Sequence, residues 1–221
     1  MRLGIGVLVG VLGAGIGLVA ANYALWVPAR GRLPRPSLRP SGHGRPALIL
    51  LGVAVASGLV CATLGTLAIP LALLPAYCLC AVSAIALAII DVRVRRLPYA
   101  LTGVMYGSCM VAFLAHTAAT GEVRPLVTCL VAGAVAFLAF LALALAFPGQ
   151  LGLGDVVLVG WIAFSLGWFA WRAAALGLLV GLVMQAAVAV VLLARPGPHR
   201  MLPMGPPLLI GWLAGVVAAT W

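Results

Sequence analysis

The sequence contains no lysine and only three acidic residues, Asp91, Glu122 and Asp155. Charged residues make up 7% of the chain, against about 25% in soluble domains, which excludes an ordinary soluble fold. Hydrophobic residues make up 65% and follow one another in long runs, and about 20 apolar residues cross a bilayer as a helix. Because transmembrane β-strands are shorter and alternate polar with apolar residues, the composition predicts an all-α polytopic integral membrane protein.

The sequence also lacks the patterns of several well-known enzyme and metal sites. It has no His-Glu-x-x-His zinc pattern and no Gly-x-Ser-x-Gly nucleophile pattern. Neither His116 nor His199 has a partner motif, so we interpret both as structural or solvated. The five cysteines form no Cys-x-x-Cys pair and all lie in apolar runs, which predicts small buried residues rather than zinc ligands or disulfides. They are Cys61, Cys78, Cys80, Cys109 and Cys129. We therefore expect no metal and no cofactor.

All thirteen basic residues are arginines, and they give the chain a formal net charge of +10. A charge of this size is also found in nucleic-acid-binding proteins. Here the arginines lie mostly in short loops between apolar runs, where arginine orients helices in the membrane and contacts anionic lipid headgroups. We therefore expect lipid headgroups as partners and no nucleic acid.

The apolar runs predict about eight transmembrane helices. Their expected positions are about 3–27, 47–66, 70–90, 99–118, 125–147, 155–170, 173–194 and 208–221. The first run carries glycines four residues apart, Gly6 with Gly10 and Gly13 with Gly17, a spacing that suits close helix packing in lipid. We therefore interpret it as a retained span rather than as a cleaved signal peptide.

Eight alternating spans place four connections on one side of the membrane. These are residues 28–46, 91–98, 148–154 and 195–207, and they hold ten of the thirteen arginines. The positive-inside rule makes this side cytoplasmic and both termini external. Asp91 then ends the third span and Asp155 begins the sixth, so both aspartates lie at the same face.

Two carboxyl groups held close together titrate as a pair that shares one proton. The ionised member can activate water while the protonated member polarises a carbonyl, which requires no metal. Asp155 begins a helix and Asp91 ends one, so the helix dipoles favour Asp155 as the ionised member. Arginines 93, 95 and 96 would favour the opposite order.

Gly152-Leu-Gly154-Asp155 has two interpretations. Glycines without a Cβ let another backbone, such as a peptide substrate, approach Asp155 closely. The alternative is that Asp155 is only a helix N-cap that follows a loop.

Three separated stretches resemble the type IV prepilin peptidase family. The first is Asp91-Val-Arg-Val-Arg-Arg-Leu-Pro98, the second is Gly152-Leu-Gly154-Asp155, and the third is Leu202-Pro203-Met-Gly205-Pro206. The resemblance divides the chain into a first span with a basic cytoplasmic loop, residues 1–46, and a peptidase-like membrane domain, residues 47–221.

This resemblance implies an aspartic endopeptidase in which Asp91 and Asp155 are catalytic. It implies that Gly152 and Gly154, together with Pro98, Pro203, Gly205 and Pro206, belong to supporting turns and loops. The expected reaction is removal of a short basic leader from prepilin or pseudopilin precursors, at the cytoplasmic face of the bacterial plasma membrane.

The sequence departs from the family pattern at two places. Val157 stands where the family usually has lysine, two residues after the second aspartate. Loop 28–46 contains no cysteine, so the cysteine-rich domain of many bacterial members is missing and we expect no methyltransferase activity.

Three alternatives remain open from the sequence. A presenilin-type intramembrane protease shares the Gly-x-Gly-Asp pattern and is expected to hold its aspartates deeper in the bilayer. A transporter would use acids as proton relays, preferably near mid-span and beside interrupted helices. A non-catalytic membrane homologue is the third, and Val157 is its main support.

Overall fold

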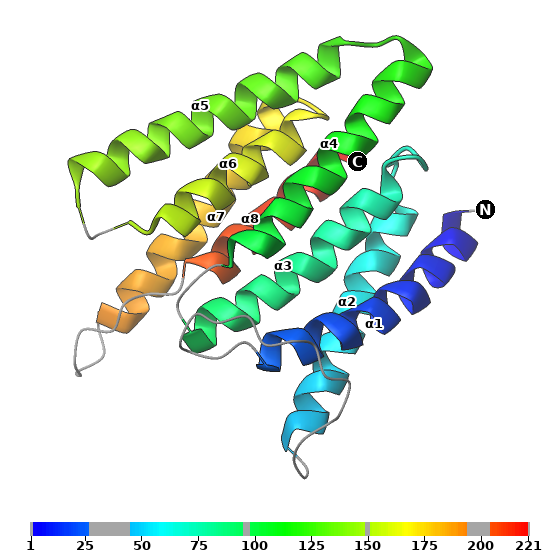
Figure 1. Ribbon diagram of the computed structural model, residues 1–221, viewed down its shortest axis with the longest axis horizontal. Coiled ribbons are helices and arrows are strands. Elements are labelled where there is room, and N and C mark those ends of the chain that lie inside the picture. Colours follow the sequence, from blue (N-terminus) through cyan, green and yellow to red (C-terminus); the bar gives the residue numbers. More distant parts are fainter. Residues whose placement is uncertain (1, 27–44, 95–97, 149–150, 194–203, 221) are drawn as a thin grey trace.

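The computed structural model describes residues 2–26, 45–94, 98–148, 151–193 and 204–220. Within these ranges the chain forms eight α-helices and no strand (Figure 1). They are α1 (Arg2–Trp26), α2 (Arg45–Thr66), α3 (Leu74–Val94), α4 (Tyr99–Thr120), α5 (Arg124–Ala146), α6 (Leu153–Gly167), α7 (Trp171–Leu193) and α8 (Gly205–Thr220). Each lies within a few residues of a predicted span, so the prediction of an all-α protein with eight helices is confirmed.

Six of the helices, α1 to α5 and α7, are long and apolar enough to cross a membrane. Helices α6 and α8 have 15 and 16 residues and reach roughly 22–24 Å at 1.5 Å per residue, less than the ~30 Å hydrocarbon core. They are also among the most enclosed helices, and in α6 nearly every residue from Val156 onward is buried. The two shortest helices therefore form the centre of the bundle.

The helices alternate in direction, and both termini lie at the same end of the molecule (Figure 1). At the opposite end α3 finishes while α6 and α8 begin. Helices α1 and α2 pack closely against each other and against α3. A methyl group on Gly13 would lie 2.6 Å from the Cβ of Cys61, and one on Gly17 would lie 2.6 Å from the Cβ of Ser57. The close packing predicted from the spaced glycines is therefore confirmed.

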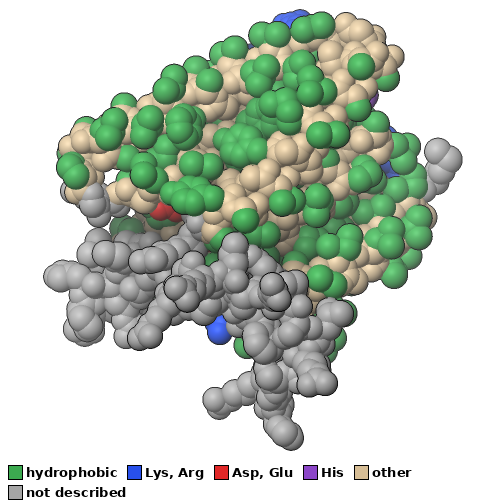
Figure 2. Space-filling view, in the orientation of Figure 1, with side chains coloured by type: hydrophobic (Ala, Val, Ile, Leu, Met, Phe, Trp, Pro, Cys, Tyr) green, Lys and Arg blue, Asp and Glu red, His purple; other side chains and the backbone are tan. Residues whose placement is uncertain are grey.

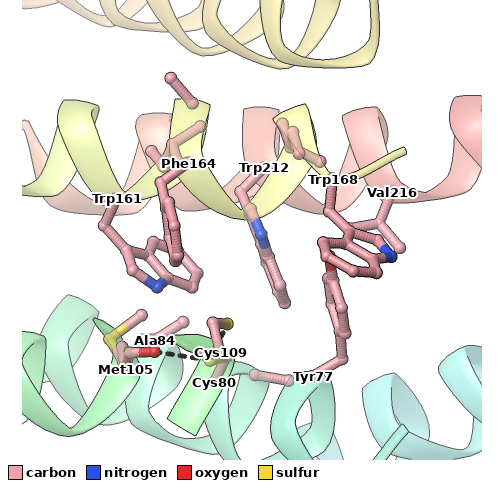
Figure 3. Close-up of a cluster of buried hydrophobic side chains, with 14 of the residues drawn as sticks. Tyr77, Cys80, Ala84, Met105, Cys109, Trp161, Phe164, Trp168, Trp212 and Val216 are labelled. Atoms are coloured by element: carbon pink, nitrogen blue, oxygen red, sulfur yellow. Dashed lines mark hydrogen bonds between the residues drawn. The ribbon is translucent and has the colours of Figure 1, made fainter. Parts of the chain in front are cut away.

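Aromatic side chains fill the space between α3 and α4 on one side and α6 and α8 on the other (Figure 3). Phe113 and Trp168 stack with ring centroids 4.3 Å apart. The Tyr77 hydroxyl donates to the backbone carbonyl of Ser165 at 2.6 Å, and Trp212 Nε1 donates to Ser165 Oγ at 3.0 Å. Ser165 thus ties α3 and α8 to the central α6, the three helices that form the site described below.

The five cysteines are free thiols. Four are buried, as predicted, while Cys78 is half-buried. Cys80 Sγ on α3 lies 3.5 Å from Cys109 Sγ on α4, so these two thiols pack the helices together. The ring of His116 packs edge-on against Trp168, which fits its predicted structural role, whereas His199 lies outside the described residues.

Ser165→Ala is expected to lower the free energy of unfolding by about 1–3 kcal/mol, because it leaves the buried Trp212 N–H without its acceptor. Denaturant unfolding in detergent measures the change. Ser57→Ala is the matched control, since Ser57 is buried and its hydroxyl has no hydrogen-bond partner among the described residues. Equal destabilisation by the two variants would contradict the role given to Ser165.

Candidate active site

Asp91 lies in the last turn of α3 and is 6% exposed. The sequence interpretation placed Asp91 at the end of the span and began a loop there. The structure corrects this, because α3 continues to Val94 and carries Arg93 as an exposed residue of its final turn. Asp91 is thus a buried helical carboxyl group rather than a solvated loop residue.

The carboxyl group of Asp91 meets the beginning of α8. The backbone N–H of Gly205, the first residue of α8, donates to Asp91 Oδ2 at 2.9 Å. Gly205 is itself buried, and Pro206 follows it as the second residue of the helix. The contact joins two of the sequence stretches that carry the family resemblance.

Asp155 lies in the first turn of α6, which begins after Gly152. The backbone N–H groups of Asp155 and Val156 both donate to the Gly152 carbonyl, at 3.0 and 3.2 Å. Gly152 is the N-cap residue, and no side chain caps the helix. Asp155 is therefore the third residue of α6 rather than its N-cap residue.

Gly152 has φ −77° and ψ 140°, angles that any residue adopts, so glycine is not required there by the backbone. What matters is space, because a methyl group on Gly152 would lie 3.0 Å from Asp155 Oδ2. The carboxyl group of Asp155 folds back over Gly152 and accepts a hydrogen bond from its backbone N–H.

The structure brings the two aspartates close enough to influence each other. Asp155 lies outside the six long helices, and its pKa is raised to about 6, first by burial and second by the negative charge of Asp91. The Gly152 N–H opposes this rise because it stabilises the carboxylate. At the end of the bundle where α6 begins, Figure 2 shows acidic side-chain atoms at the surface, bordered by hydrophobic side chains.

The remaining residues predicted for the supporting loops are placed as follows. Pro98 is the N-cap residue of α4, and Gly154 lies in the first turn of α6 beside Asp155. Pro203 lies outside the described residues, as do Arg95 and Arg96. Direct neighbours of the carboxyl groups are Gly205 for Asp91 and Gly152 for Asp155.

Val157, which replaces the usual lysine of the family, is half-buried on α6. Its backbone carbonyl accepts a hydrogen bond from the Tyr106 hydroxyl at 3.3 Å, a contact that the sequence did not predict. Residues two apart on a helix do not face each other, so the side chain at position 157 points away from that of Asp155.

The chemical groups that the described residues bring to this site include two carboxyl groups and the backbone N–H donors of Gly205 and Gly152. Within the described residues, no three or more histidine, cysteine, aspartate or glutamate side chains gather in a way that could hold a metal ion. The carboxyl pair itself has the composition needed for acid–base activation of water.

Comparison with known proteins gives a family match. The model of the type IV leader peptidase family matches residues 78–194, which is more than half of the chain and runs from α3 through α7. The matched range contains both Asp91 and Asp155. Neither the curated proteins nor the solved structures gave a match. The chain belongs to the type IV leader peptidase family.

Proposed function

We propose that this protein is a membrane aspartic endopeptidase that removes the short basic leader from type IV prepilin or pseudopilin precursors. The observation that carries the proposal is the placement of Asp91 and Asp155 at the same end of the bundle. Asp91 is buried there, and its negative charge raises the pKa of Asp155. Family membership supplies the protease class, and the carboxyl pair supplies the aspartic chemistry.

The proposed reaction uses one ionised and one protonated aspartate. The carboxylate takes a proton from a water molecule as the water oxygen attacks the scissile carbonyl carbon, and the other carboxyl group gives its proton to the carbonyl oxygen. The tetrahedral intermediate then breaks its C–N bond, while a proton passes to the leaving amine. The pair ends the cycle with one proton, as it began.

The position of the pair supports cleavage at the membrane edge. Helix α3 ends at Val94, only about 4.5 Å along the axis beyond Asp91, whereas half of a hydrocarbon core is about 15 Å. A presenilin-type protease would be expected to hold the aspartates deeper. The proposed cut therefore lies between the leader and the apolar segment that follows it.

The proposed location is the bacterial plasma membrane, with the aspartates on the cytoplasmic side. The arginine distribution along the sequence supports this orientation. A basic leader is not expected to pair with arginine loops, so we propose that those loops contact anionic lipid headgroups. No role with nucleic acid and no methyltransferase step is proposed.

Co-expression with a precursor tests the proposal. The precursor carries a short basic leader followed by an apolar segment, and mass spectrometry reads the N-terminus of the product. The expected product begins directly after the leader. A product cut within the apolar segment would favour the presenilin-type alternative, and an uncut precursor beside membrane-inserted wild-type protein would favour a non-catalytic homologue.

A further inference from the structure

The beginning of α8 offers very few backbone donors. The first N–H groups of any helix lack acceptors within the helix, but here the helix opens with Gly205-Pro206-Pro207, and proline has no N–H. The N–H of Leu208 donates back to the carbonyl of the residue before the helix. The donor that remains is the Gly205 N–H, and it binds Asp91 Oδ2 at 2.9 Å.

Gly205 is close enough to Asp91 that a side chain would disturb this bond. A methyl group on Gly205 would lie 3.0 Å from Oδ2, 3.3 Å from Cβ and 3.4 Å from Cγ of Asp91. The first of these distances is well inside normal van der Waals contact. Glycine thus lets the backbone approach the carboxyl group from the side that carries the N–H.

The start of α8 places positive potential on Asp91. A helix N-terminus favours a negative charge, and a hydrogen bond to an ionised acceptor is roughly twice as strong as one between neutral groups. This contribution opposes the dipole of α3, in whose last turn Asp91 lies. The expectation from the sequence considered the helix that carries each aspartate and the three arginines after Asp91, and it did not include α8.

The charged residues of the described segments lie at the two ends of the bundle. The end that holds the pair carries Asp91, Asp155 and Arg93, together with Arg45, the first residue of α2, and Tyr99, the first residue of α4. The remaining charged residues of the described segments, together with His116, lie toward the opposite end. They are Arg2, His116, Glu122, Arg124 and Arg172.

We propose that the head of α8 keeps Asp91 ionised and leaves the shared proton on Asp155. Gly205 is then a positioning residue, Asp91 is the base that takes the proton from water, and Asp155 is the acid that protonates the scissile carbonyl. The inference rests on the proposed function and reverses the order expected from the helix ends. The raised pKa of Asp155, about 6, agrees with it.

The pH profile of Gly205→Ala tests the assignment. The rate of a proton-sharing pair rises as the first proton leaves and falls as the second leaves. A weaker Gly205 bond destabilises every state that contains ionised Asp91, namely the singly and the doubly ionised pair. The rising limb of kcat/KM should therefore move to higher pH by about one unit, while the falling limb stays in place.

Gly152→Ala is the reciprocal variant, because it places a methyl group 3.0 Å from Asp155 Oδ2. Gly152 is exposed and its backbone angles suit alanine, so this variant should fold. If Asp155 is ionised only in the doubly ionised pair, the falling limb moves to higher pH and the rising limb stays in place.

Opposite shifts would overturn the inference. A Gly205→Ala variant that moves only the falling limb, or a Gly152→Ala variant that moves only the rising limb, would place the proton on Asp91. If Gly205→Ala fails to fold or to cleave, the Gly152→Ala profile decides alone. If the wild-type protein cleaves and its pH profile has both limbs, opposite shifts in the variants overturn the inference but leave the proposed function intact. If the wild-type protein never cleaves the precursor, the proposed function itself is contradicted.

Discussion

The substitution Asp91→Asn or Asp155→Asn is expected to lower kcat/KM for leader cleavage by about 10²–10⁴-fold, the usual contribution of a general acid or base. Asparagine keeps the shape of aspartate but neither accepts a proton from water nor delivers one to a carbonyl. Initial rates of the purified variants on one precursor in detergent measure the loss. Denaturant unfolding curves of the variants and of wild type, recorded in detergent, show whether the variants are folded.

Two comparisons separate this effect from a general loss of charge. Glu122→Gln removes the third acid of the chain, which is exposed at the opposite end of the bundle, and should leave the rate unchanged. The double variant Asp91→Asn/Asp155→Asn should be no slower than the slower single variant, because the two groups act as a unit. Single variants that stay within about tenfold of wild type, or losses that multiply in the double variant, would contradict the shared role.

The rate is expected to fall roughly tenfold for each pH unit above about 6, because the pair then loses its shared proton. The sign follows from the raised pKa of Asp155, since the protonated form is the active acid and is lost as the pH rises. A profile of kcat/KM from pH 4 to 9 in detergent measures it. A rate that instead rises through pH 6 to 8 would mean that both aspartates work ionised.

The raised pKa of Asp155 also affects the stability of the folded protein. The pKa of Asp155 is raised from 3.8 to about 6 in the folded protein, so its protonated form is favoured by folding. This contribution is fully present below about pH 4 and is lost as the pH rises through 6. A stability profile that runs in the opposite direction would contradict the burial of Asp155 against Asp91.

The eight helices were predictable because most of the apolar runs are long and are bounded by proline, glycine or charged residues. The number of helices also placed both aspartates at one end, because two crossings separate the connection after Asp91 from the connection before Asp155. The length of α3 was less predictable. The polar residues Asp91 and Arg93 indicated the start of a loop, but α3 includes both of them and continues to Val94, and Asp91 is buried.

The contact between Asp91 and Gly205 was not predictable from local sequence. It joins residues on α3 and α8 and depends on how both helices pack against α6, which the Ser165 hydrogen bonds help to fix. A signal was nevertheless present, because the prolines after Gly205 leave that residue as the available donor of its helix start. The order of ionisation expected from the sequence used the helix that carries each aspartate, with the arginines after Asp91 favouring the opposite order, whereas the structure adds a second helix end at Asp91.

The most direct test of the proposed aspartic pair is one incubation of purified protein with full-length precursor. Wild type, Asp91→Asn and Asp155→Asn are compared, and mass spectrometry identifies the N-terminus of any product. The expected result is a product that begins directly after the leader with wild type, and intact precursor with both variants. The same product from either variant would show that cleavage does not depend on the pair.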